Sequence, residues 1–250
     1  MLALTSIFVP KAADVLAEKL REQILQGQLH EGTLLPNERD LATRASLSRA
    51  SVREALRILE VEGLITTRTG RNGGSEVVRP SSATVQRSIG IFIRGQQIRL
   101  EAVLETREAI EPRAAHLAAL HHSAQDFEDL EKCHAKLEQA SASDDIPAFL
   151  QANLDWHVQV VRAGHNELLI AFITAISQSV YAATDLDGFN AIDGRNAVIL
   201  AHRRVMNAIK AGDASAAARR MGRHVAAYIG DVQRNASTEA LKVDGLTRKL

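Results

Sequence analysis

The chain has 250 residues, of which 46% are hydrophobic and 24% charged, a composition typical of a folded protein with one or two domains. Thirty basic and thirty acidic residues give a net charge of zero, which argues against a protein that coats nucleic acid uniformly. No apolar run reaches the ~20 residues that cross a bilayer, and the N-terminus lacks the features of a signal peptide. The single cysteine, Cys133, cannot form an internal disulfide. We therefore expect a cytoplasmic protein without a membrane anchor.

Charge and turn residues are distributed unevenly along the chain. Between Arg39 and Arg79, eight arginines accompany five acidic residues, whereas eight of the nine histidines lie beyond residue 80. A stretch rich in glycine and serine, 69–82, separates the two regions. We predict three parts: a first domain over 1–80, a second domain over 81–235, and a disordered polar tail over 236–250.

The first region predicts three helices. Apolar residues recur at helical spacing over 11–26, and Gly27 ends that segment. Asn37 can cap a short second helix, and Ser48 can cap a third that ends before Gly63. The third helix has a predicted buried face of Val52, Ala55, Leu56 and Leu59, and an opposite face of Arg49, Arg53 and Arg57.

Two short β-type segments, 64–68 and 75–79, follow the third helix. The pair Asn72-Gly73 between them favours a two-residue hairpin turn. Three arginines on a helix usually indicate only a solvated surface. Here the preceding short helix and turn and the glycine-rich hairpin together favour a winged helix-turn-helix, whose third helix reads DNA.

The second region predicts an all-α domain of six or seven helices, so the chain as a whole is expected to be mainly α with a two-stranded β wing. Strand patterns are lacking and proline is nearly absent after residue 83. The helical segments are 85–95, 100–121, 123–141, 145–163, 166–185, 192–211 and 213–233.

Histidines interrupt the apolar faces of three of these helices. His157, His202 and His224 each lie among residues expected to be buried, and Asn153 lies one turn before His157 on the same face. Three imidazoles and an oxygen donor, with coordination positions left open, suit a divalent metal such as Zn²⁺, Ni²⁺ or Mn²⁺. The pattern alone leaves a metal site and a hydrogen-bonded core evenly balanced. The remaining histidines of this region are interpreted as surface or structural residues: His116, His121, His122, His134 and His165.

Arg107 stands in the middle of the apolar face of segment 100–121. A buried guanidinium needs an anionic partner, because burying an unpaired charge is very costly. That partner is either Glu111, one helical turn further on, or a carboxylate from outside the protein. The residues alone leave both interpretations open.

The first 80 residues resemble the DNA-binding domain of the GntR superfamily of bacterial transcription regulators. The resemblance rests on the string LPNERDLATRASLSRASVREALRILEVEGLITTRTGRNGGSEVV. It implies that the following residues approach DNA from the two helices and the wing: Arg39, Ser48, Arg49, Ala50, Arg53, Thr69 and Gly70. Chemically, Arg49 and Arg53 suit guanine or phosphate, and Arg39 suits the DNA backbone. Ala50 offers only a contact with a thymine methyl.

The second region is similar to the FadR-type C-terminal domain of that superfamily, the FCD domain. The matching pieces are TREAIEPRAAHLAA, NLDWHVQVVRAGHNELL and AHRRVMNAIKAGDASAAARRMGRHV. The resemblance implies metal ligands at Asn153, His157, His202 and His224, with the neutral Asn153 at a position where many members have an aspartate. It also implies that Arg107 helps to bind a carboxylate effector.

Residues and resemblance together predict a ligand-responsive transcription regulator of the FadR subfamily rather than an enzyme. We expect a homodimer on a pseudo-palindromic operator in double-stranded DNA, acting as a repressor that a small carboxylic, hydroxy or sugar acid releases. Two alternatives stay open. One is a regulator that senses the metal itself, and the other is a metal-dependent hydrolase, for which the faces that carry the histidines offer no acidic general base.

Overall fold

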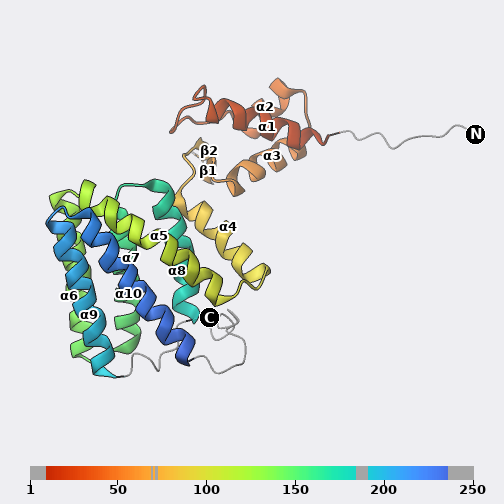
Figure 1. Cartoon of the computed structure of the whole chain (residues 1–250). Helices are drawn as coiled ribbons and strands as arrows, with labels where there is room; N and C mark the ends of the chain where they lie inside the picture. The colour runs from red at the N-terminus through yellow and green to blue at the C-terminus, as the bar shows by residue number, and fades with distance from the viewer. Residues whose placement is uncertain (1–9, 69, 71–72, 184–190, 236–250) are drawn as a thin grey trace, which may run out of the picture. The chain divides into compact units, whose positions relative to one another are not determined.

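The computed structural model describes residues 10–68, 70, 73–183 and 191–235 of the chain (Figure 1). Its contacts divide the chain into two compact units, Met1–Thr84 and Val85–Leu250. The described residues are mainly helical and include one two-stranded sheet, as the sequence predicts. No helix among them is both long and apolar enough to cross a lipid bilayer.

The first unit is a winged helix-turn-helix. Its elements are α1 (Ala12–Leu25), α2 (Glu38–Ala45), α3 (Arg49–Val61), β1 (Ile65–Arg68) and β2 (Gly74–Val77). The predicted caps are confirmed: the Asp40 N–H donates to Asn37 Oδ1 at 2.9 Å, and the Ser51 N–H donates to Ser48 Oγ at 3.1 Å. Gly63 adopts φ +74° just past the end of α3, a conformation that favours glycine. The predicted buried face of α3 is confirmed too, and it packs against α1.

The wing differs from its prediction at the turn. The two strands are antiparallel, and their last pair is Arg68 with Gly74. Five residues therefore connect the strands, so the expected two-residue turn at Asn72-Gly73 is wrong, although Thr69, Arg71 and Asn72 themselves lie outside the described residues. The pairing register of the strands decides the length of the loop, and it cannot be read from the Asn-Gly pair alone.

The second unit is all-α, with seven helices among its described residues. They are α4 (Ser82–Gly95), α5 (Leu100–His121), α6 (Ala124–Ala142), α7 (Ile146–Arg162), α8 (Glu167–Ala183), α9 (Ile192–Lys210) and α10 (Ala214–Asn235). These bounds lie within a few residues of the predicted segments, because apolar residues at helical spacing mark each buried face.

The helices of the second unit pack into a bundle in which distant segments become neighbours (Figure 1). Helix α10 lies against both α5 and α9, and α5 also contacts α7. Their shared core contains the largest buried side chain of the chain, Trp156 of α7, with Met206 of α9 and Met221 of α10 beside it. This packing places the histidine-bearing faces of α7, α9 and α10 toward one another.

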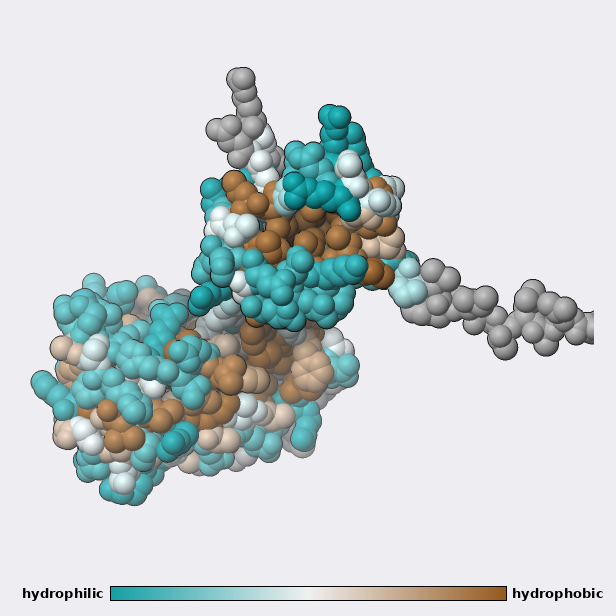
Figure 2. Space-filling model, turned by 90° about the horizontal axis from the view of Figure 1, so that it is seen from above, coloured by the Kyte–Doolittle hydropathy of each residue, from teal (hydrophilic) through white to brown (hydrophobic). Residues whose placement is uncertain are grey.

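Polar residues cover most of the surface visible in Figure 2, with apolar patches between them. Several large apolar side chains of the second unit are exposed, among them Ile91 and Phe92 of α4 and Leu168 and Phe172 of α8. Leu168, at 72%, is the most exposed of these four.

Candidate metal centre and nucleic-acid interface

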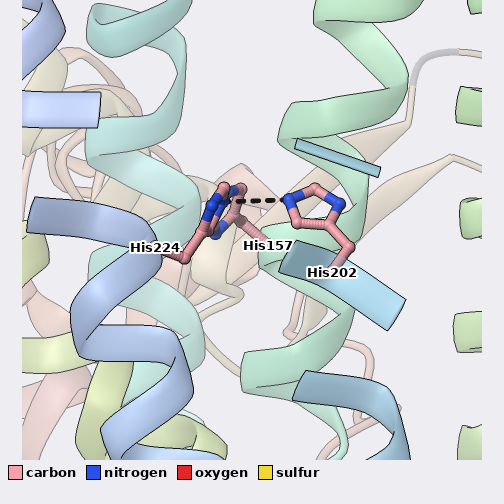
Figure 3. Close-up of side chains that lie close together, drawn as sticks. All are labelled: His157, His202 and His224. Atoms are coloured by element: carbon pink, nitrogen blue, oxygen red, sulfur yellow. Dashed lines mark hydrogen bonds between the residues drawn. The ribbon is translucent and has the colours of Figure 1, made fainter. Parts of the chain in front are cut away.

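Three helices each contribute one histidine to a compact cluster (Figure 3). The Nε2 atom of His224 lies 3.0 Å from that of His202 and 3.2 Å from that of His157. His157 and His202 are buried, whereas His224 is partly exposed. The packing of α7, α9 and α10 thus brings together the three histidines that the sequence placed on the apolar faces of three helices.

The distances from Nε2 of His224 to the other two Nε2 atoms suit ligands of one metal ion, and all three ligand atoms lie within 4.8 Å of one another. With metal–nitrogen bonds of about 2.1 Å, two ligand nitrogens in tetrahedral or octahedral coordination lie roughly 3.0–3.4 Å apart. The two separations from Nε2 of His224, 3.0 and 3.2 Å, fall in that range. Two imidazole nitrogens at this distance form a hydrogen bond only if one of them carries a proton, whereas a shared cation accepts both lone pairs.

Glu111 fixes the orientation of one of these histidines. It reaches the cluster from α5, and its Oε2 accepts a hydrogen bond from Nδ1 of His157 at 2.6 Å. With the proton on Nδ1, the Nε2 lone pair of His157 points into the cluster, which is the usual arrangement of a metal-bound histidine with a carboxylate behind it. Sequence analysis identified Glu111 only as a neighbour of Arg107, because a contact across 46 residues leaves no local pattern.

Trp156 packs against His202, a second histidine of the cluster. Its ring stacks on that of His202 with centroids 3.5 Å apart and planes 5° from parallel. His202 Nδ1 and Trp156 Nε1 are both buried without a hydrogen-bond partner among the described residues. Stacking on Trp156 therefore helps to set the plane of His202, together with the contact between its Nε2 and that of His224. The sequence offers no specific sign of this role, since a tryptophan beside a histidine is equally compatible with ordinary core packing.

The electrostatic surroundings keep the three imidazoles neutral. Burial lowers the pKa of His202 well below its usual value, and the nearby His224 and His157 lower it further. Burial and His157 lower the pKa of His224 to about 3, and burial also lowers the pKa of His157 in spite of the neighbouring Glu111. Neutral imidazole is the form that binds metal, so the cluster needs no deprotonation at neutral pH.

Asn153 occupies the turn of α7 before His157. Its Oδ1 is buried and has no hydrogen-bond partner among the described residues. An orphaned buried oxygen of this kind costs free energy unless an external partner satisfies it. The residue thus has the unsatisfied oxygen donor that a fourth ligand would need.

Arg107 and Glu111 form a buried ion pair, so the protein itself supplies the anionic partner of this guanidinium. Arg107 Nε donates to Glu111 Oε1 at 2.5 Å, and the guanidinium carbon lies 5.5 Å from the ring centre of Tyr228. Among the described residues, no acceptor is hydrogen-bonded to the two Nη atoms of Arg107. Burial opposes ionisation, but the charge of Arg107 and the hydrogen bonds that His157 and Arg107 donate outweigh it and hold the pKa of Glu111 well below its usual range.

The residues expected to approach DNA are mostly exposed. Arg39 of α2 and the first turn of α3, with Ser48, Arg49 and Ala50, are open to solvent. Gly70, in the wing, is exposed with φ +121°, whereas Thr69 lies outside the described residues. The exposed first turn of a helix that follows a short helix is the part of a winged helix that enters the major groove.

Arg53 has a partner that the sequence did not reveal. Its Nε and Nη2 donate to both carboxylate oxygens of Glu38 in α2, the Nη2 bond being 2.8 Å long. The hydrogen bond from Arg53 lowers the pKa of Glu38. Bidentate recognition of guanine by Arg53 therefore requires it to give up at least part of its bond with Glu38.

The other histidines of the second region lie outside the cluster of His157, His202 and His224. His134 is fully buried, with Nε2 3.2 Å from the carbonyl oxygen of Ile199. His165 contacts Asp126, His122 contacts the Ala118 carbonyl, and residues 116 and 121 are partly or fully exposed.

The fold and the exposed first turn of α3 define a DNA-binding protein with a separate helical domain. Comparison with known families agrees: residues 12–73 match the family described as bacterial regulatory proteins, gntR family, and residues 102–227, half of the chain, match the FCD domain. The chain belongs to the GntR family of transcription regulators, and its FCD domain makes it a FadR-like member. It is a DNA-binding regulator and not an enzyme.

Several regulatory proteins are similar to this chain over most of their length. The chain is 28% identical to the Glc operon transcriptional activator of Escherichia coli over 203 residues, covering 78% of this chain and 79% of the relative. It is 28% identical to a putative L-lactate dehydrogenase operon regulatory protein of E. coli, covering 86% and 84%. An HTH-type regulator of Mycobacterium tuberculosis is 30% identical, covering 86% and 88%. Among solved structures, a GntR protein of Streptococcus agalactiae superposes with a TM-score of 0.65 at 25% identity, covering 86% of this chain and 98% of the other.

Proposed function

We propose that this regulator binds a pseudo-palindromic operator as a homodimer and is released from it by a small carboxylic, hydroxy or sugar acid. A divalent metal in the FCD domain takes part in binding that acid. Because operator DNA of a bacterium lies in the cytoplasm, we place the protein there. One relative is a putative regulatory protein of an L-lactate dehydrogenase operon, which agrees with a hydroxy acid.

The observation that carries this proposal is the convergence of three Nε2 atoms from three helices. His157, His202 and His224 would hold the ion, with Asn153 as a further donor. The bound metal supplies a Lewis acid with open positions that suit a carboxylate and a neighbouring hydroxyl. Its identity, Zn²⁺, Ni²⁺ or Mn²⁺, stays open.

Arg107 supports the binding of a carboxylate near the metal. It is linked to His157 through Glu111, which contacts both residues. The guanidinium of Arg107 and the proposed metal ligands therefore belong to one buried network. Glu111 engages Nε of Arg107, and a carboxylate arriving from outside would use its Nη atoms.

Operator binding is proposed to use the exposed first turn of α3. Arg49 and Arg53 reach base edges or phosphates, Arg39 contacts the backbone, and residues 69–70 of the wing reach the neighbouring groove. A second copy would cover exposed apolar residues of the helical domain such as Leu168, and its own winged helix would then occupy the second half-site.

One experiment tests the metal and the effector together. Operator duplexes selected from random DNA by the purified protein are titrated with the metal-loaded protein, then with a chelator, then with a panel of small hydroxy and sugar acids. Release by an acid that needs the metal supports the proposal. Release by the chelator alone makes the metal itself the signal, and no response to either refutes an effector role for this site.

The variant Arg107→Ala tests whether Arg107 is needed for the response to the effector rather than for folding and operator binding. We expect the variant to bind operator as the wild type does but to be insensitive to the acid that releases the wild type. Arg107→Lys keeps the charge and the pairing with Glu111 but loses the planar fork, and we expect it to respond only weakly. An Arg107→Ala variant that is still fully released by the same acid contradicts this assignment.

A further inference from the structure

The donors around the proposed metal are all electrically neutral. His157, His202 and His224 bind a cation as uncharged imidazoles, and the amide of Asn153 carries no charge. No thiolate or carboxylate joins the histidine cluster among the described residues. The protein's donors therefore bring no negative charge to a divalent ion.

The charges next to these donors cancel. Arg107 and Glu111 are charged groups that act on the imidazoles, and they are paired with each other at 2.5 Å. Both are buried, with 8% and 1% of their side chains exposed. Their sum is zero, so two positive charges brought by a metal stay without a counter-charge inside the protein.

An uncompensated double charge in a buried site is costly, and a metal-bound water compensates one of the two charges only when it loses a proton. A carboxylate on one of the open coordination positions compensates one charge directly, because it brings a negative charge into contact with the ion. We infer that the metal and the acid bind this site interdependently: the site binds the metal weakly when the metal is alone, and tightly when a small carboxylate binds with it. This inference rests on the function proposed above.

This interdependence has a direct consequence for regulation. By thermodynamic linkage, the factor by which the acid tightens metal binding equals the factor by which the metal tightens acid binding. When free metal is scarce, the acid recruits the ion to the protein. The regulator then responds to the acid over a range of metal concentrations in which the metal alone leaves the site largely empty.

The test measures metal affinity with and without a charge-compensating anion. Ni²⁺ affinity of the full chain is determined by competition with a chromophoric chelator, in acetate and in acetamide at equal ionic strength. Acetamide has nearly the shape of acetate but no charge. We expect Ni²⁺ to bind wild type at least 10-fold more tightly in acetate, within the usual 5–150-fold range of binding couplings.

Asn153→Asp provides the reciprocal variant, because it places a negative charge among the donors with little change in shape. We expect it to bind Ni²⁺ about 10-fold more tightly than wild type in acetamide, and to gain less than about threefold from acetate, in line with the same coupling range. Asn207→Asp adds the same charge at an exposed position of α9 and should leave both affinities within about twofold of wild type, as surface charges interact weakly through solvent.

The outcomes are distinct. Equal wild-type affinity in acetate and acetamide overturns the inference, as does an Asn153→Asp variant that depends on acetate as strongly as wild type. If wild type binds no Ni²⁺ or Zn²⁺ in either solution, the metal site itself fails, and with it the proposed function. The wild-type comparison needs no variant, so it decides the question even if Asn153→Asp folds poorly.

Discussion

Arg53 illustrates how one side chain can be held ready for a ligand by an acidic neighbour. Glu38 engages its Nε and Nη2, and among the described residues its Nη1 has no hydrogen-bond partner. The pair joins α2 to α3 across 15 residues, so it also fixes the two helices of the DNA-binding motif to each other. Both side chains are substantially exposed, and such a pair contributes little to stability, so DNA phosphates can replace Glu38 at low cost.

Arg53→Ala should therefore reduce operator affinity by about 1–3 kcal/mol while the fold is retained, because a base or phosphate contact is lost. Fluorescence anisotropy with a selected operator duplex measures the effect, and circular dichroism checks the helices. Arg113→Ala removes the same charge from an exposed position of the helical domain and should leave binding unchanged. Wild-type operator affinity in Arg53→Ala would remove this residue from the DNA interface.

Glu111 is a residue that the structure adds to the candidate metal site, through its contact with His157. Glu111→Gln keeps the size of the side chain but not its charge, so it holds the Nδ1 proton of His157 less strongly and leaves Arg107 without a counter-charge. Loss of such a supporting carboxylate lowers metal affinity by roughly 10–100-fold. Chelator competition measures this, with Glu108→Gln, an exposed position of the same helix, as the control. Equal metal affinities in the two variants would contradict a supporting role.

At the scale of elements, the start of α3 combines a structural and a functional task. Ser48 accepts the Ser51 N–H and caps the helix, and the same exposed turn carries Arg49 and Ala50. A cap stabilises the helix that carries these residues, which are proposed to contact DNA. Loss of operator affinity on substitution of Ser48 could thus arise from the cap or from a contact with DNA, and two substitutions separate these causes.

Ser48→Ala removes the cap and should lower the free energy of unfolding of the DNA-binding domain by about 0.5–2 kcal/mol. Ser48→Asp restores a capping oxygen and should recover that stability, yet it places a negative charge where DNA phosphates approach, so operator binding should fall below that of Ser48→Ala. Chemical denaturation and anisotropy measure the two effects. If Ser48→Asp binds operator as tightly as wild type, this turn does not face the DNA backbone.

The helices could be predicted closely because each carries its own signals. In α3, the apolar residues Val52 and Leu59 mark the buried face, Ser48 marks the start and Gly63 marks the end. Such signals act over a few residues and need no knowledge of the partner. The loop of the wing was predicted less well, since strand register depends on pairing across the hairpin and not on the turn residues alone.

At the scale of the whole molecule, the buried histidine cluster makes stability depend on pH. In the metal-free protein, burial lowers the pKa of His157, His202 and His224, whereas in the unfolded chain each has a pKa of about 6.5. Below pH 6.5 the unfolded chain takes up protons that the folded chain does not. Stability should therefore fall as the pH decreases, by up to about 1.4 kcal/mol per pH unit for each histidine, and should be independent of these groups above that value.

Urea unfolding between pH 5 and 8 in the presence of a chelator measures this slope. His202→Gln removes one titrating group and should make the slope shallower, whereas His121→Gln, at an exposed position, should leave it unchanged. A wild-type stability that does not vary below pH 6.5 would show that the cluster opens to solvent and takes up protons in the folded state.

The sequence by itself determined the two-domain, mainly helical architecture, the family, and the three histidines with Asn153 on inward faces. These properties are local: periodicity, caps and motif strings are complete within one segment. Only the tertiary structure decided that Glu111 connects Arg107 to His157, that Trp156 stacks on His202, and that Glu38 holds Arg53. Two different helices are joined by each of the contacts Glu111–His157, Trp156–His202 and Glu38–Arg53. The packing of those helices depends on the whole buried core rather than on any one segment.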